Sequence, residues 1–518
     1  MAAVRPAPFR RALPRPVRTL GLEFKRSPVL YMLPLLAAVF YLDSMRAADG
    51  YPPVWTLRAS VIDQNLLLDF CAFAGGIAAW AGAREGRRKT ADLLATTPRA
   101  AWSRLSDALA ATLGWLILAF LGCVAVLYVQ TALQATGGEP PLWPVLVGLA
   151  GVTVVTVTGF TCGAVFPGRF TAPLVALAMP VLFEVGFREA LAVRVSSGKH
   201  ALTYSAHAPL TARVFQELTS LTSGTYALLS PANVTPGVDT GVYYRVAPDL
   251  SIVQVMFMGG LAVAAFGVLG LAAGLRELKP AGGWPSRLVA VALVACGVAA
   301  SWTGLALAGT AKPDAVAGGW EIPALHSAAS DQPAAAVPDC MSAARFQVCV
   351  DPALGFDLPS VAAELDPVAA ELAGLPGAPA RAEEVPSLHD GRTVMAHISG
   401  SPPVFEFSTE HVDSVDTWPD GADDLAGWRT GFPQGMLDAF LTGPSPTARL
   451  NSAQQAVEDA LLAAAGAQPT ALTPGTPQPP PPAAARRFEA LSAGARQAWL
   501  AVHLPALRAG RITVAQLP

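Results

Sequence analysis

The stretch Ala108–Leu133 reads ALAATLGWLILAFLGCVAVLYVQTAL and contains no charged side chain. A helix of about 20 apolar residues is long enough to cross the hydrocarbon core of a bilayer. This stretch therefore predicts a membrane-spanning helix, and the composition of the whole chain agrees. Charged residues make up 14% of the 518 residues, whereas a soluble protein has about 25%. The mean hydropathy is +0.42.

Further apolar stretches lie on both sides of this one. In chain order, all seven cover residues 28–42, 66–83, 108–133, 141–166, 171–187, 252–275 and 288–311. The first and the fifth are short for a full crossing and depend on their flanking residues. The basic segment before the first is too long for a signal peptide, and no small-x-small cleavage site follows, which favours a signal anchor. We expect an all-α polytopic membrane protein with six spans in 29–287 and a seventh at 288–311.

The charge of the chain changes sign near residue 311. Residues 1–311 hold 24 Lys and Arg against 15 Asp and Glu, whereas residues 312–518 hold 11 against 23. Within the first part, the alternating connections that include 1–28 and 84–104 carry 17 basic residues, and those on the opposite side carry 7. Basic residues concentrate on the cytoplasmic side of a membrane. This predicts a multi-pass cell-membrane protein with a cytoplasmic N-terminus and residues 312–518 outside.

Two carboxylates fall inside the predicted spans. Asp69 lies in the second span and Glu184 near the outer end of the fifth. Carboxylates within a membrane are expensive and often functional, so both are candidate site residues. The alternative is a structural role, in which each side chain makes a hydrogen bond or contacts lipid headgroups at a helix end.

The loop after the second span has a pattern of its own. The basic stretch 84–89 precedes a segment that can form a short helix carrying Leu93 and Leu94. Thr97 and Pro98 then look like the N-cap and first residue of the next helix. A short helix with two exposed Leu is suited to docking on another protein. The alternative is a basic loop that only contacts anionic lipid.

A second amphipathic segment precedes the first span. Val17, Leu20 and Phe24 recur at helical spacing, and Arg18, Lys25 and Arg26 surround them. This pattern predicts an interfacial helix, about three turns long, lying on the inner leaflet. We place this helix within the cytoplasmic N-terminus, residues 1–28.

Together these features resemble the permease subunit of a type-2 ABC (ATP-binding cassette) exporter. The resemblance covers residues 15–280 and includes the interfacial helix, the loop after the second span, the tight turn 167–170 and the longer outer loop 188–250. In that family the loop serves as a coupling helix for the ATPase. Carried over to this chain, the resemblance implies coupling residues Arg87, Arg88, Thr90, Asp92, Leu93, Leu94 and Pro98. The seventh span and the outer domain depart from the family pattern, as does Lys89 where a Gly is common.

The resemblance also implies partners. Two permease subunits, as a homodimer or a heterodimer, would bind two ATPase subunits, with ATP and Mg on those partners and no cofactor on this chain. A P-loop is absent from the sequence, and the nearest string, Ser197-Gly-Lys-His200, lacks its first Gly and final hydroxyl. Membrane lipid is the other expected partner, and nothing indicates nucleic acid.

The outer part begins with a linker at 312–339. Residues 340–465 contain both strand-like alternation and helical periodicity. They predict a small α/β or α+β domain, with strands at 346–350, 393–398 and 404–408. Helices are expected at 361–372 and at 452–464. Pro367 would kink or split the first of these two helices. Cys340 and Cys349 predict a disulfide, since this domain is expected outside the cytoplasm. The alternative is two free buried thiols.

The end of the chain comprises a Pro-rich spacer at 466–485 and a basic helix at 486–518. Phe488, Leu491, Ala495, Ala498, Trp499 and Val502 are expected on one helical face. This helix could dock on the acidic outer domain, lie on lipid or bind a partner, and intramolecular docking is slightly favoured. Neither a zinc-peptidase string nor a nucleophile elbow occurs, and no metal site is expected. The chain is thus not expected to be an enzyme. The alternative to an exporter is a non-transporting sensor or scaffold, or less plausibly an anchored hydrolase.

Overall fold

The computed structural model describes most of the chain. The described residues are 15–62, 66–88, 100–181, 193–194, 225–226, 248–276, 284–313, 320–327, 337–342, 346–386, 388–389, 392–393, 396–408, 431–443, 450–467 and 482–518. Several predicted site residues lie outside them, namely Thr90, Asp92, Leu93, Leu94, Pro98 and Glu184.

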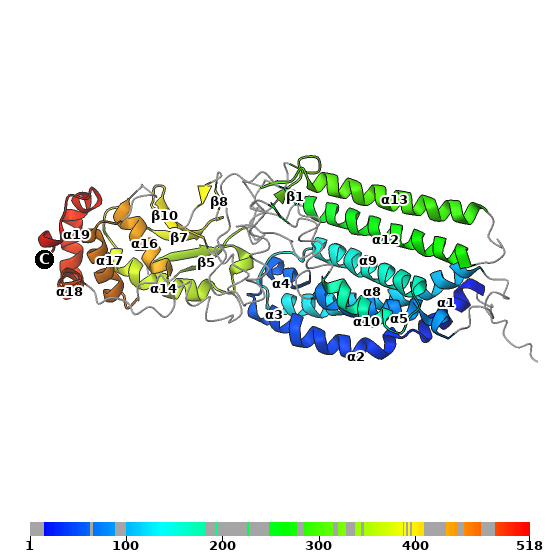
Figure 1. Cartoon of the computed structure of the whole chain (residues 1–518). Coiled ribbons are helices and arrows are strands. Elements are labelled where there is room, and N and C mark those ends of the chain that lie inside the picture. The colour runs from blue at the N-terminus through cyan, green and yellow to red at the C-terminus, as the bar shows by residue number, and fades with distance from the viewer. Residues whose placement is uncertain are drawn as a thin grey trace, which may run out of the picture.

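The first part of the chain is a bundle of long helices that run side by side (Figure 1). It comprises α1 (Arg15–Lys25), α2 (Val29–Phe40), α3 (Arg46–Gly50), α4 (Trp55–Val61), α5 (Leu67–Gly82), α6 (Arg84–Arg87), α8 (Ala101–Gln134), α9 (Trp143–Val165), α10 (Thr171–Val181), α12 (Asp249–Arg276) and α13 (Trp284–Ala308). In the described part of the chain, five helical segments are long and apolar enough to cross a membrane: Val29–Asp49, Ala101–Gln134, Trp143–Val165, Asp249–Leu275 and Arg287–Ala308. The chain is therefore a helical membrane protein.

The lengths of the short spans differ from the expectation. The first predicted span is long enough, because a π-helical turn at Tyr41–Met45 joins α2 to α3 and extends the helix to 21 residues. The described helix of the second is α5, with 16 residues. The described part of the fifth is α10, with 11 residues.

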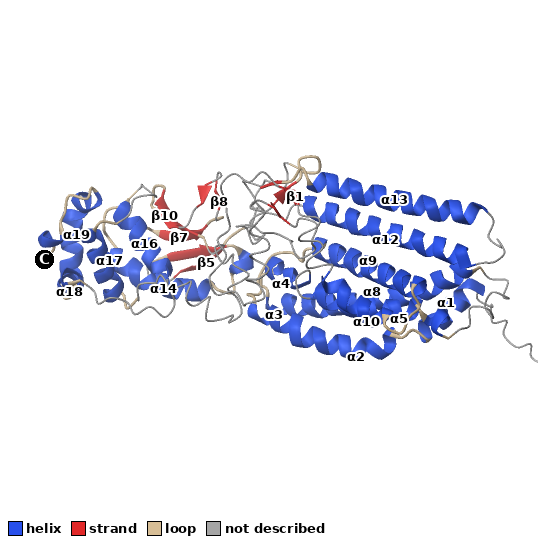
Figure 2. Cartoon of the chain, in the orientation of Figure 1, coloured by secondary structure: helices blue, strands red, loops and turns tan. Residues whose placement is uncertain are grey.

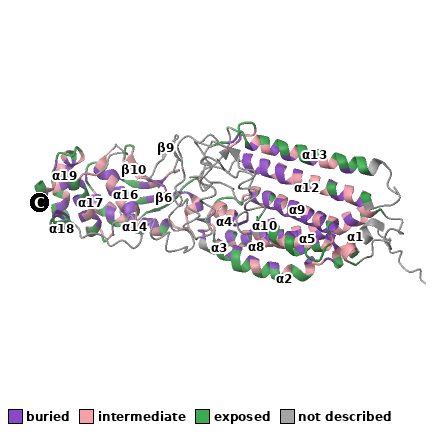
Figure 3. Ribbon diagram, in the orientation of Figure 1, coloured by how far each residue is buried: buried purple, intermediate pink, exposed green. Residues whose placement is uncertain are grey.

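Glycines bring α5 and α9 into close contact at the centre of the bundle. A Cβ on Gly82 would overlap the carbonyl oxygen of Phe160, and one on Gly163 would overlap that of Ala79. Small residues allow helix backbones to approach closely where no hydrophobic effect drives helices together. The two helices are accordingly among the most buried in the bundle (Figure 3).

Helix α13 packs along α12 at the edge of the bundle. Gly260 and Gly297 meet at the crossing, and the Ser301 hydroxyl donates a hydrogen bond of 3.0 Å to the carbonyl of Phe257. The opposite face of α13 is apolar and exposed, with Val298 at 55% and Trp302 at 69% (Figure 3). A face of this kind fits lipid contact, since apolar patches of such extent are rare on soluble surfaces.

The last part of the chain is built on a five-stranded mixed sheet, shown in red in Figure 2. Its order is β10 (Ala396–Ser399), β11 (Val404–Phe407), β7 (Arg381–Glu384), β6 (Gln347–Val350) and β5 (Asp339–Ser342). β11 pairs with β7 and β6 with β7 in parallel, and the two edge pairs are antiparallel. Short pairs form at β1–β2 (Val193–Arg194, Thr225–Tyr226), β3–β4 (Lys312–Pro313, Trp320–Glu321) and β8–β9 (Leu388–His389, Arg392–Thr393).

Among the described residues, five helices complete this C-terminal domain, called the outer domain for its predicted side of the membrane, around a core of its own. They are α14 (Leu358–Leu372), α16 (Gly431–Thr442), α17 (Ser452–Ala464), α18 (Ala483–Glu489) and α19 (Ala493–Arg508). Phe405 and Phe407 point into the core from the sheet, and Phe440 and Phe488 from the helices. The predicted helix 452–464 forms as α17 with an Asn451 capping box. Helix α14 begins earlier than predicted and runs through Pro367 without splitting.

The C-terminal segment docks on the outer domain, but its buried face differs from the predicted one. Instead of one continuous face, the chain forms two helices, and Ser492 caps the start of α19. This break resets the helical phase, so that Val502 is 73% exposed while Arg496, Leu500 and Leu504 are buried. The predicted shared face was therefore wrong, although intramolecular docking is what the structure shows. The domain core extends past residue 465 as far as Leu517.

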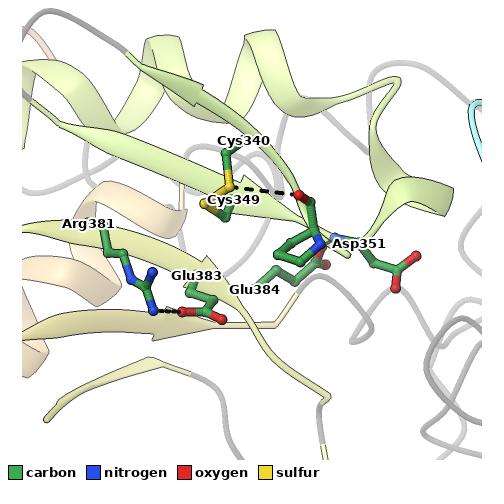
Figure 4. The surroundings of a disulfide bond; sticks show 7 residues. Cys340, Cys349, Asp351, Arg381, Glu383 and Glu384 are labelled. Carbon is green, nitrogen blue, oxygen red and sulfur yellow. Dashed lines mark hydrogen bonds and ion pairs between the residues drawn. A yellow bond between two sulfur atoms is a disulfide. The ribbon is translucent and has the colours of Figure 1, made fainter. Parts of the chain in front are cut away.

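The predicted disulfide between Cys340 and Cys349 is present (Figure 4). The two residues are directly opposite each other in the antiparallel pair of β5 and β6. β5 is an edge strand whose side chains are all exposed, so they contribute little packing. The disulfide therefore helps to hold this strand to the sheet. The predicted strand at 393–398 is divided, with Arg392–Thr393 in β9 and Ala396–Ser399 in β10.

Candidate coupling surface

Helix α1 lies against α8 at the end of the bundle away from the outer domain (Figure 1). The ring of Phe24 is 5.8 Å from that of Trp115, and the Trp115 indole Nε1 donates a hydrogen bond of 2.8 Å to the Phe24 carbonyl. Gly114 leaves the space that the Phe24 ring fills. The predicted amphipathic helix therefore has a defined seat on the bundle, and the indole satisfies a carbonyl near the C-terminus of α1.

Two ion pairs fasten the start of the loop to its surroundings. Glu23 on α1 pairs with Arg84 on α6 at 3.0 Å, and Glu85 on α6 pairs with Arg104 on α8 at 3.5 Å. The Glu85–Arg104 side chains are 23% and 16% exposed, so solvent screens them less than a surface pair. Helix α6 thus bridges α1 and the beginning of α8.

Helix α6 also contacts the tight turn between α9 and α10. A Cβ on Gly86 would collide with the ring of Pro167, so the absence of a side chain there permits this contact. The Thr171 hydroxyl closes the turn by donating a hydrogen bond of 2.5 Å to the Phe166 carbonyl. Two features on which the family resemblance rests, the loop after the second span and the 167–170 turn, therefore meet.

The two arginines predicted for coupling have different surroundings. The Arg87 guanidinium stacks 3.4 Å from the centre of the Trp80 ring and donates a hydrogen bond of 2.7 Å to the Trp80 carbonyl. Burial, and secondarily the charge of Arg88, lower the pKa of Arg87 below its usual value. Arg88 is exposed at the C-cap of α6. Arg87 therefore holds the base of the loop in place, while the side chain of Arg88 is exposed to solvent.

The intramembrane candidate Asp69 lies in the first turn of α5. Its Oδ2 atom is buried and makes no hydrogen bond within the described part of the chain. A buried carboxyl oxygen without a partner is costly in a membrane, which is compatible with the functional interpretation. The other candidate, Glu184, lies beyond the described end of α10.

Glu23 and Glu85 were not singled out from the sequence, although they organise this surface. Each is a lone acidic residue within a basic stretch. In a region where positive charge sets topology, an isolated carboxylate is a usable signal of a specific pairing. The partner of each could not be read, because the pairs span 61 and 19 positions.

The fold and this surface define a helical membrane protein with an organised polar end. Comparisons with protein-family models, curated proteins and solved structures found no match to this chain.

Proposed function

We propose that this chain is the membrane-spanning permease subunit of an ABC exporter, coupled to a separate ATPase subunit. One observation carries the proposal: Arg84 and Glu85 on α6 are paired to α1 and α8 at the end of the bundle opposite the outer domain. The segment 89–99, with Leu93 and Leu94, leaves from this braced base. A force applied to this segment would therefore act on α6 and, through its ion pairs, on α1 and α8.

The proposed topology follows from the same arrangement. The α1 end of the bundle is cytoplasmic, as its basic residues favour, and the outer domain lies across the membrane from it. Seven spans are proposed, with α5 and the segment starting at α10 completing the five long ones. ATP and Mg would bind on the partner, and two permease subunits would pair to enclose a path.

In this mechanism the chain transmits movement and carries out no chemistry. ATP-driven closure of the ATPases displaces the docked loop, and the ion pairs pass that displacement to α1 and α8. The two ion pairs act on different helices. The Glu23–Arg84 pair acts on α1, and the Glu85–Arg104 pair acts directly on the 34-residue helix α8. Since α8 runs the length of the bundle, a tilt at its cytoplasmic end moves its outer end as well.

A second candidate is a non-transporting scaffold whose outer domain is the working part. The observation in its favour is the seating of that domain on the bundle. The Thr136 hydroxyl donates a hydrogen bond of 2.8 Å to the Pro352 carbonyl, and a Cβ on Gly137 would overlap Pro352. A seated domain of this size suits display of a fixed binding surface.

Mutation separates the two functions. The variant Leu93→Asp with Leu94→Asp should abolish co-purification with the ATPase, because a docking helix loses about 1.5–3 kcal/mol for each buried Leu. Arg88→Gln should weaken the complex less, and Val502→Asp, on an exposed site of the outer domain, should have no effect. Retained ATPase binding by the double variant, or no ATPase with the wild type, would favour the scaffold.

A further inference from the structure

The segment after α13 folds back onto the outer end of α12. β3 pairs with β4, and Ile322 just beyond β4 is completely buried in the core of the helix bundle. Leu325 packs against the same core. This segment precedes β5, the first strand of the outer domain. Part of the predicted linker 312–339 is therefore a fixed foot for that domain.

A buried carboxylate holds the foot in place. Asp249, the first residue of α12, has a side chain only 1% exposed. Its Oδ2 atom accepts a hydrogen bond of 3.1 Å from the Ile322 backbone N–H and lies 3.1 Å from His326 Nδ1. Its Oδ1 atom is buried and makes no hydrogen bond within the described residues. Within the described residues, both contacts of the Asp249 carboxylate are therefore made by the same oxygen.

His326 lies between two carboxylates. Its Nδ1 faces Asp249, and its Nε2 is 3.9 Å from Glu321 Oε2. Lys312 pairs in register with Glu321 across β3 and β4 and is exposed. Asp249 on α12, Glu321 on β4 and Lys312 on β3 therefore place charged groups on three of the described elements that pack here.

We propose that His326 is a proton-dependent clasp that holds the foot of the outer domain on α12. A protonated imidazole donates a hydrogen bond from Nδ1 to Asp249 and places a positive charge 3.9 Å from the Glu321 carboxylate. It also places a positive charge beside the buried Asp249 carboxylate. Histidine is the side chain that changes charge near neutral pH.

The direction of the effect follows from linkage. The closed clasp favours the imidazolium, so closure is strongest in acid and weakens as the pH rises through the titration of His326. A neutral imidazole can still donate from Nδ1, and the Ile322 hydrogen bond and apolar contacts persist. The foot therefore opens more often in alkaline conditions without detaching permanently.

Hydrogen exchange on the full-length protein in detergent tests the clasp. The reporter is the peptide containing residues 320–327, where the amides of Leu325 and His326 bond to the Ile322 carbonyl at 2.8 Å. After correction for intrinsic exchange, its opening should increase about three- to tenfold from pH 5.5 to 8.5. Each tenfold difference in proton affinity between closed and open forms gives a tenfold change.

Three variants complete the design. His326→Gln keeps a hydrogen-bonding group but cannot titrate, so its opening should be independent of pH; Glu321→Gln, at a half-exposed site, should reduce the dependence. His503→Gln is the control, because His503 stacks on Trp499 in α19 and should leave the reporter unchanged. The clasp is excluded by a wild type without pH dependence, or by a His326→Gln or Glu321→Gln variant that keeps the full dependence. None of these outcomes depends on an ATPase partner.

Discussion

Arg496 on α19 and Glu371 on α14 form a two-point ion pair, with Nη2 2.8 Å from Oε1 and Nε 3.2 Å from Oε2. The same guanidinium donates to the carbonyls of Glu489 and Leu491 at the break between α18 and α19. One buried arginine thus joins the C-terminal helix to the domain and satisfies the end of the helix before it. This pairing crosses 125 positions of sequence.

Truncation of this arginine should destabilise the outer domain. Arg496→Ala leaves the Glu371 carboxylate and two carbonyls without their donor. We expect the free energy of unfolding to fall by about 2–4 kcal/mol, because a buried carboxylate without its partner keeps its desolvation cost. Thermal unfolding of the full-length protein measures this. Arg496→Met with Glu371→Leu should recover part of the loss. Equal losses in the single and double variants would contradict a net cost from the unpaired carboxylate.

The buried pair Glu458 and Asp438 should make the outer domain more stable in acid. Glu458 on α17 is 3% exposed and shares a hydrogen bond with Asp438 on α16. Burial first, and the neighbouring acidic groups second, raise the pKa of Glu458 to about 8, and burial raises that of Asp438 too. The folded state therefore retains a proton that the unfolded chain releases near pH 4–5. Stability should fall as the pH rises from that range to about 8.

Glu458→Gln should flatten this dependence in melting curves recorded between pH 4.5 and 8.5, since a neutral amide cannot lose a proton. Glu139→Gln, at an exposed position in the α8–α9 connection, is the matched control and should keep the wild-type slope. A Glu458→Gln variant with the wild-type slope would show that the pair does not share a proton.

The contact between α5 and α9 should be intolerant of side chains. Gly163→Val places a branched group against the Ala79 backbone, which cannot move aside as a flexible side chain could. Overpacking of this kind costs about 1–3 kcal/mol or more, so the yield of monodisperse protein after detergent extraction should drop. Gly122→Val on α8 is the control, because no atom lies within 4 Å of its Cβ position. Similar yields from both variants would refute the close approach.

The proposed sidedness can be tested by labelling. Single cysteines at Ser103 and Ser330, in a background lacking the four free cysteines Cys71, Cys123, Cys162 and Cys296, are exposed to an impermeant thiol reagent on intact cells. Position 330 should react and position 103 should react only after lysis. The reverse pattern would place the outer domain in the cytoplasm and overturn the proposed topology. Cys340 and Cys349 are left unchanged, because their disulfide leaves no free thiol to react with the reagent.

The sequence by itself determined the membrane class, the outer-domain disulfide and the position of α17. These follow from local quantities: apolar length in Ala108–Leu133, two cysteines in the outer part, and the helical periodicity of residues 452–464. Hydrophobicity and helical periodicity act over a few turns of chain, so neighbouring residues suffice to reveal them.

Only the tertiary structure decided which residues meet. Glu23 with Arg84, Asp249 with His326 and Arg496 with Glu371 are joined by chain reversals, and their sequence separations carry no information about the pairing. The buried face of α19 was also decided there, because a break at Ser492 shifts the helical phase. A period fixes the spacing of a face, but packing chooses which face is covered. The candidate coupling surface and the His326 clasp belong to this second class.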